Sequence, residues 1–220
     1  MKARNEKRHI VIVTTEIVPY SKVGGLADVM GALPDELEKL GCSVTIMTPL
    51  YASIDRSKFG ITASSGRAKL SAPVAGDPVP FSLYRATKPG TSIDVYFVEN
   101  ERFYGRDGIY TVPETGEAFE DEAERTVFFN RAVMASIKAL DLHPDVIHCN
   151  DFHSGLIPAY LKLQEGTESP LGSAGTVFSV HNLAYQGLYE RDFLELAGLD
   201  RELFTPMGPF EFWGKVNVMK

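Results

Sequence analysis

The chain has 220 residues, of which 44% are hydrophobic and 23% are charged, and its formal net charge is −7. This composition is typical of a soluble globular protein with one substantial core, and the acidic balance excludes broad attraction to nucleic acid or to anionic lipid. No apolar run approaches the length of a membrane-spanning helix, so no membrane partner is expected.

The first predicted unit is a strand, a glycine turn and a helix. His9–Thr14 is a β-like apolar run, and Leu26–Leu40 has apolar residues at helical spacing. Between them, Gly24 and Gly25 let a ligand approach the backbone, and the helix start offers unpaired N–H groups to a phosphate. Lys22 adds a positive charge just before the turn. This order predicts an anion-binding turn, with the diphosphate of a nucleotide-linked substrate as the favoured ligand.

A packing role is an equal alternative for these glycines, because glycine pairs open helices in many α/β proteins. The stretch has neither the G-x-G-x-x-G nor the Walker pattern, so a dinucleotide site and a P-loop are not predicted. Glu16, Lys22 and Asp28 share one turn at the carboxyl end of the first strand, where open α/β sheets bind their ligands. These three residues are therefore candidate binding residues.

The middle of the chain is expected to extend the sheet. Gly41 suits the end of the first helix, and Ser43–Thr48 is a second strand, parallel to the first. Val79–Ala86 and Ile93–Val98 are typical of an antiparallel hairpin inserted into the fold. The loop Arg102–Tyr110, rich in aromatic and charged residues, either covers a site or is an ordinary packed surface loop.

The remaining segments alternate between helix and strand. Helices are predicted over Glu120–Leu140, His153–Leu163, Asp192–Ala197 and Glu211–Lys220, and strands over Pro144–His148 and Thr176–Val180. The apolar stripe of the longest helix indicates core rather than cofactor contact. The whole pattern predicts a Rossmann-like, mainly parallel, doubly wound α/β sheet with an antiparallel hairpin insertion.

Two polar corners follow the later strands. Asp151 and His153 belong to the cluster His148-Cys149-Asn150-Asp151-Phe152-His153, for which a zinc site is a weak alternative because no second cluster has ligand spacing. We therefore expect no metal, and a helix cap is the local alternative for Asp151. His181 and Asn182 follow the next strand and offer donors and acceptors to sugar hydroxyls, unless His181 is a hydrogen-bonded structural residue. The three strand ends are expected to converge on one ligand cleft.

The two cysteines, Cys42 and Cys149, form no disulfide framework and favour a reducing compartment. A cytoplasmic protein is therefore expected, or one of the plastid stroma if a transit peptide has been removed.

Three stretches resemble one known family. Lys22-Val23-Gly24-Gly25-Leu26 is similar to the Lys-x-Gly-Gly-Leu signature of bacterial glycogen synthases and plant starch synthases. His148–His153 resembles the His-x-x-Asp-Trp-His segment of that family, with Phe152 in place of tryptophan, which weakens or alters stacking against a sugar. Val180–Gly187 matches the family's Val-His-Asn-Leu-Ala-Tyr-Gln-Gly segment in full.

The resemblance implies a retaining glycosyltransferase of GT-B architecture, which moves glucose from ADP-glucose to the non-reducing end of an α-1,4-glucan such as glycogen or starch. It implies no cofactor, no metal and no nucleic-acid partner. Residues 1–220 would be the amino-terminal, acceptor-side domain, truncated at Lys220, without the second, nucleotide-binding domain. His181 would lie beside the reacting carbon of the glucose, and the implied substrate-binding residues are Glu16, Lys22, Gly24, Gly25, Asp28, Tyr104, Asp151, His153 and Asn182.

Two other functions stay open. The chain could be a glycan- or phosphate-binding fragment without turnover, or part of a GT-B transferase that uses another donor such as UDP-glucose. In the family, the second domain carries the adenine site, further cationic residues and a catalytic carboxylate. The isolated chain is therefore expected to be inactive.

Overall fold

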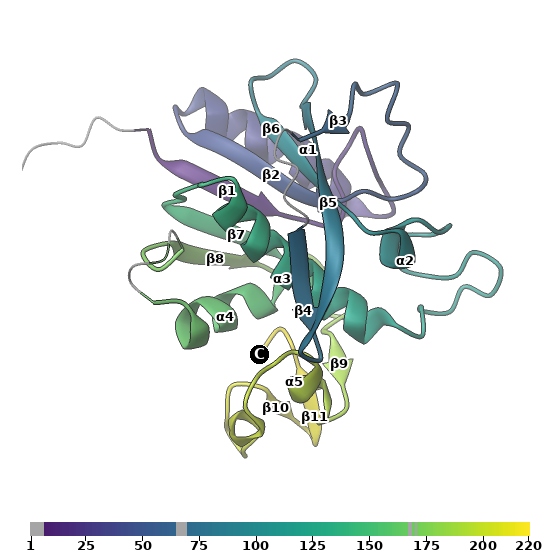
Figure 1. The fold of residues 1–220 in the computed structure, drawn as a ribbon, viewed down its shortest axis with the longest axis vertical. Helices are drawn as coiled ribbons and strands as arrows, with labels where there is room; N and C mark the ends of the chain where they lie inside the picture. The colour runs from purple at the N-terminus through teal and green to yellow at the C-terminus, as the bar shows by residue number, and fades with distance from the viewer. Residues whose placement is uncertain (1–6, 65–69, 167–168, 170) are drawn as a thin grey trace, which may run out of the picture.

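The computed structural model describes residues 7–64, 70–166, 169 and 171–220. An eight-stranded sheet runs through it in the order β3-β5-β6-β2-β1-β7-β8, and β4 pairs with β5 beside this path (Figure 1). Its parallel part comprises β6 (Asp94–Glu99), β2 (Ser43–Pro49), β1 (His9–Val13), β7 (Val146–Asn150) and β8 (Gly175–Ser179). The predicted, mainly parallel α/β sheet is therefore confirmed.

The central strand β1 shows why these segments become buried parallel strands. Val11, Ile12 and Val13 are all fully buried, as expected for a strand covered on both faces. The chain leaves β1 through α1 (Gly25–Lys39) to β2, then returns past both strands through α3 (Glu122–Ala139) to β7 and through α4 (Leu156–Gln164) to β8. This reversal puts a topological switch point between β1 and β7, where open α/β sheets place their ligand crevice.

The antiparallel insertion is larger than the sequence indicates. β5 (Asp77–Thr87) pairs with β6 as expected, and it also pairs with β4 (Leu70–Val74) and with the short β3 (Thr62–Ala63). Strand β4 packs against α3. The predicted hairpin is thus confirmed, and the structure adds two strands to it.

Helix boundaries follow local chemistry. Gly41 has φ +89°, its N–H donates to the Glu38 carbonyl, and the Cys42 N–H donates to the Leu37 carbonyl, which makes the expected glycine end of α1. The predicted helix over His153–Leu163 begins instead as a 3-10 turn, Phe152–Ser154, and continues as α4. Two short helices, α2 (Glu101–Tyr104) and α5 (Phe193–Leu196), complete the set of described α-helices.

The helix predicted over Glu211–Lys220 is wrong. This segment is a hairpin of β10 (Glu211–Phe212) and β11 (Lys215–Asn217), and β11 pairs with β9 (Leu188–Tyr189) in a small antiparallel sheet. The turn residues Trp213 and Gly214 have φ values of 53° and 82°, which a hairpin turn requires and a helix excludes. The small sheet lies at the end of the molecule opposite β3 (Figure 1).

Candidate functional site

The three predicted polar corners lie at the carboxyl ends of β1, β7 and β8, which are neighbours in the sheet. Asn150, the last residue of β7, connects them. Its side-chain N–H₂ donates to the Val13 carbonyl at the end of β1 (3.1 Å), and its Oδ1 is 2.9 Å from the Nε2 atom of His181 beyond β8. Residues from all three strand ends therefore belong to one hydrogen-bonded group.

Asp151 holds the corner that contains His181. Its Oδ1 accepts the backbone N–H of His181 (2.7 Å) and, at 3.4 Å, that of Asn182. It makes no side-chain cap for the turn that follows it, so the helix-cap alternative is not supported. Asp151 has φ 53° and ψ 177°, a conformation that costs about 1–3 kcal/mol in a residue other than glycine. Such strain is typical of functional sites. Here the strained residue is the one whose carboxylate binds the backbone N–H of His181.

Phe152, which replaces the family's tryptophan, has a buried ring. The ring centroid lies 3.7 Å from that of His153, and a Cβ added to Gly187 would come within 2.6 Å of the Phe152 ring. Gly187 has φ +65°, so both its backbone conformation and this close approach require glycine. Phe152 therefore fixes the end of the segment that follows His181, and its ring is not open to solvent for stacking on a sugar.

Glu16 supports the glycine turn from inside. Its side chain is buried, and one carboxylate oxygen accepts the backbone N–H of Val23 and, at 2.8 Å, that of Gly24. The other oxygen accepts the Tyr110 hydroxyl at 2.7 Å. The Gly24 N–H is thus already occupied in this structure. Gly25 begins α1, and the first N–H groups of a helix have no intrahelical partner, so these groups remain available to a ligand.

Lys22 and Asp28 form an ion pair on the surface of the same turn. Their closest atoms are 2.6 Å apart, and their side chains are 52% and 57% exposed. Exposed ion pairs contribute only about 0–1 kcal/mol, because water and dissolved salt screen them. An anion of higher charge can therefore displace Asp28 from Lys22 at low cost.

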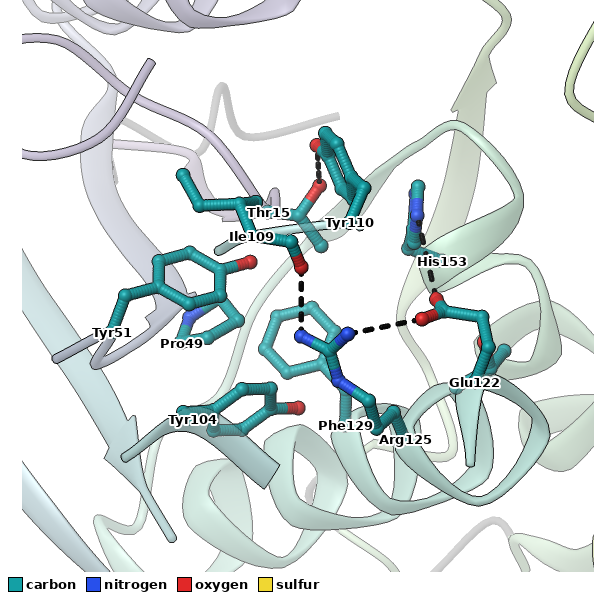
Figure 2. Close-up of a pocket in the computed structure, with 11 residues that line it drawn as sticks. Thr15, Pro49, Tyr51, Tyr104, Ile109, Tyr110, Glu122, Arg125, Phe129 and His153 are labelled. Carbon is teal, nitrogen blue, oxygen red and sulfur yellow. Dashed lines mark hydrogen bonds and ion pairs between the residues drawn. The ribbon is translucent and has the colours of Figure 1, made fainter. Parts of the chain in front are cut away.

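A small cavity of about 20 Å³ lies beside this group, under the loop that follows α2 (Figure 2). Tyr110 closes it: its hydroxyl also hydrogen-bonds Thr15 (2.7 Å), and its ring stacks on His153 with centroids 4.8 Å apart. The cavity can hold about one water molecule and is too small for a sugar ring. Tyr104 lines it and is buried, with its ring edge-on to Tyr51. The loop 102–110 therefore covers part of the candidate site.

Buried charges line one side of the cavity (Figure 2). Arg125 donates to Glu122 (3.0 Å) and to the Ile109 carbonyl (2.8 Å). Burial, with Arg125 nearby, lowers the pKa of His153 to about 3, and burial raises the pKa of Glu122 to about 7 although Arg125 opposes that rise. His153 is therefore neutral at physiological pH, and its Nδ1 is buried without a hydrogen-bond partner in the described part of the chain.

Substitution of Glu122 by glutamine is expected to change how stability depends on pH. Because the folded-state pKa of Glu122 is raised, the wild type loses stability as the pH increases from about 4.5 through about 7, when a buried carboxylate must form. Glu122→Gln cannot ionise, so its free energy of unfolding relative to wild type should increase by up to about 3 kcal/mol over this range. Urea unfolding at pH 5 and pH 8 measures the difference. If the free energies of unfolding of Glu122→Gln and wild type differ by the same amount at both pH values, the pKa of Glu122 is not raised in the folded protein.

Sequence reasoning did not single out four residues of this arrangement: Asn150, Tyr110, Glu122 and Arg125. Asn150 lies inside the polar cluster His148–His153, and Tyr110 ends the aromatic loop, so a signal was present for both. Glu122 falls in the acidic first turn of α3, where it indicates only a favourable helix dipole, and nothing in the sequence pattern marks Arg125.

No metal cluster is found where the structure describes the chain: no three or more His, Cys, Asp or Glu side chains gather there as ligands. In the cluster His148–His153, three members have polar atoms on protein partners: His148 Nε2 is 2.8 Å from the Ser179 hydroxyl, and Asn150 and Asp151 bind His181. Within the same residues, no helix has the length and apolar character needed to cross a membrane.

Comparison with known proteins gives a consistent result. A family model described as the starch synthase catalytic domain matches residues 9–220. The glycogen synthases of Geotalea uraniireducens (strain Rf4) and Pseudothermotoga lettingae are 41% and 35% identical to the chain over 211 and 213 residues, and each match covers 96% of this chain and 42% of that protein. The catalytic domain of Starch Synthase IV from Arabidopsis thaliana, bound to ADP and acarbose, superposes with a TM-score of 0.80 at 25% identity, covering 97% of this chain and 42% of that one.

Proposed function

Because the chain belongs to the starch synthase catalytic domain family, we propose that the whole protein transfers glucose from ADP-glucose to the non-reducing end of an α-1,4-glucan, with retention at the anomeric carbon. The chain spans 42% of the length of the curated relatives it matches. The rest of the protein would supply the second, nucleotide-binding domain of a GT-B enzyme. A cytoplasmic location is part of the proposal, favoured by the bacterial glycogen synthases among the relatives.

One observation carries the proposal: the ends of β1, β7 and β8 are joined by hydrogen bonds through Asn150 and Asp151. The turn after β1 adds the exposed Lys22–Asp28 ion pair and the N–H groups at the start of α1. Such a group offers cationic and N–H contacts to a diphosphate and paired donors and acceptors to a sugar. ADP, bound to the Arabidopsis relative, is the product that transfer from ADP-glucose would release.

In the proposed reaction, the bond between the glucose anomeric carbon and the diphosphate oxygen breaks, and a bond to the acceptor's O4 forms. The acceptor proton leaves with the diphosphate. Lys22 and the N–H groups at the start of α1 would stabilise the departing charge, and His181 would stabilise positive charge that develops on the sugar. With cationic side chains on the diphosphate, the proposal requires no metal and no other cofactor. Closure of the second domain would exclude water, which competes as an acceptor.

The direct test uses the full-length protein with glycogen and either ADP-glucose or UDP-glucose, in buffer containing a chelator of divalent metal ions. We expect ADP release and growth of the glucan with ADP-glucose, with much lower turnover of UDP-glucose. Faster turnover of UDP-glucose would show that the proposed donor is wrong and would leave the proposed glucosyl transfer standing. No transfer from either donor would overturn the proposal, and turnover by residues 1–220 alone would remove the role given to the second domain.

A further inference from the structure

Asn150 has a fully buried side chain whose hydrogen bonds fix its orientation. The N–H₂ group lies 3.1 Å from the Val13 carbonyl and 3.3 Å from the His148 carbonyl. Both partners can only accept, so the nitrogen must face them and the oxygen Oδ1 must face His181. The opposite orientation would place the amide oxygen against two carbonyl oxygens. The main chain is equally constrained, because the Asn150 N–H donates to the Ser154 hydroxyl at 2.6 Å.

This orientation determines the protonation pattern of His181. The Oδ1 atom is 2.9 Å from Nε2 and can only accept a hydrogen bond, so Nε2 carries the proton. In the neutral ring, Nδ1 then has a free lone pair, and none of the described residues donates a hydrogen bond to it. Nδ1 points away from the buried Asn150, on a residue that is itself exposed. The ring thus offers an acceptor atom to a ligand that binds beside it.

We propose that Asn150 is a positioning residue, which selects the Nε2–H tautomer of His181 and aims its free Nδ1 atom at the substrate. The inference rests on the proposed function, in which His181 acts beside the sugar. Two contacts then place His181: Asn150 holds the ring, and Asp151 holds the main-chain N–H. An Nδ1 lone pair can accept a sugar hydroxyl or face positive charge at the anomeric carbon, whereas the Nδ1–H tautomer would present a proton there.

The test combines nuclear magnetic resonance with kinetics on the full-length protein. Long-range ¹H–¹⁵N spectra of ¹⁵N-histidine-labelled protein identify the neutral tautomer, and His181→Gln assigns the signal. We expect the Nε2–H tautomer in the wild type and a mixture of tautomers in Asn150→Ala, which has no acceptor oxygen for the ring. In Asn150→Ala, kcat should fall about 100-fold, as for a misplaced catalytic group, with a much smaller change in KM.

Asn130 provides the matched control, because it is also fully buried and fully hydrogen-bonded, and none of its hydrogen bonds is to a histidine ring. It donates to the Thr126 and His153 carbonyls and accepts the N–H groups of Leu156 and Ile157. Asn130→Ala should lower stability and leave the His181 signals unchanged.

The proposal is overturned by an Nδ1–H tautomer in the wild type, a result that needs no variant. It is also overturned if Asn150→Ala keeps the wild-type tautomer. Full transferase activity in His181→Ala would remove the role of His181 from the proposed function. The spectra would still decide what Asn150 does to the ring, so the two failures are distinguishable.

Discussion

His181→Ala is expected to reduce kcat of the full-length transferase by about 10²–10³-fold, or about 3–4 kcal/mol of transition-state stabilisation. The ring would act on charge that appears only as the bond to the diphosphate breaks, so KM for the donor should change little. In the variant, the backbone N–H of residue 181 still donates to the Asp151 carboxylate, so the backbone carbonyl of residue 181 should stay in place. The substitution therefore removes the ring and its hydrogen bond to Asn150 while the main chain stays in place, and initial rates over a range of donor concentrations measure the effect.

His143→Ala is the matched control for a lost imidazole. His143 is exposed in the loop before β7, and its Nε2 lies 3.2 Å from Asp141. Its removal should leave kcat and KM within about twofold of wild type, since surface substitutions rarely affect a distant site. A His181→Ala enzyme with kcat within threefold of wild type would refute a catalytic role for this ring.

Much of the fold was predictable because its signals are local. β1 contains the β-branched residues Val11, Ile12 and Val13, which are fully buried. The chain leaves α1 through Gly41, whose positive φ value few other residues adopt. In a doubly wound sheet the parallel strands end at one edge, so the residues that follow them lie close together, and ligands bind at this carboxyl edge. That rule places the candidate site from the order of the segments alone, without any side-chain contact.

The contacts that build the site were not predictable, because they join residues far apart in the sequence. Tyr110 reaches Glu16 across 94 positions, and His181 reaches Asn150 across 31. Nothing near Glu16 in the sequence indicates that its carboxylate will hold the glycine turn. The wrong helix over Glu211–Lys220 has a similar cause: tertiary pairing of β11 with β9 decided the structure of that segment.

Lys22→Ala is expected to reduce kcat/KM for ADP-glucose by about 100-fold, the effect of removing one preorganised charge from a departing diphosphate. Its partner Asp28 and Lys22 itself are both more than half exposed, so the pair contributes little to stability and the variant should fold normally. The free energy of unfolding should change by less than about 1 kcal/mol. Initial rates and urea unfolding of the same preparation separate the two effects.

Lys39→Ala is the control for loss of a surface lysine on the same helix. Lys39 lies in the last turn of α1, pairs with Glu36 at 2.7 Å and is 69% exposed, but it is far along the helix from the glycine turn. Lys39→Ala should leave kcat/KM unchanged.

Salt dependence gives a second test of Lys22. Because dissolved salt screens charges that meet in water, kcat/KM of the wild type should fall as ionic strength rises, and kcat/KM of Lys22→Ala should depend less on ionic strength. Equal salt dependence in wild type and Lys22→Ala would mean that Lys22 does not meet the diphosphate.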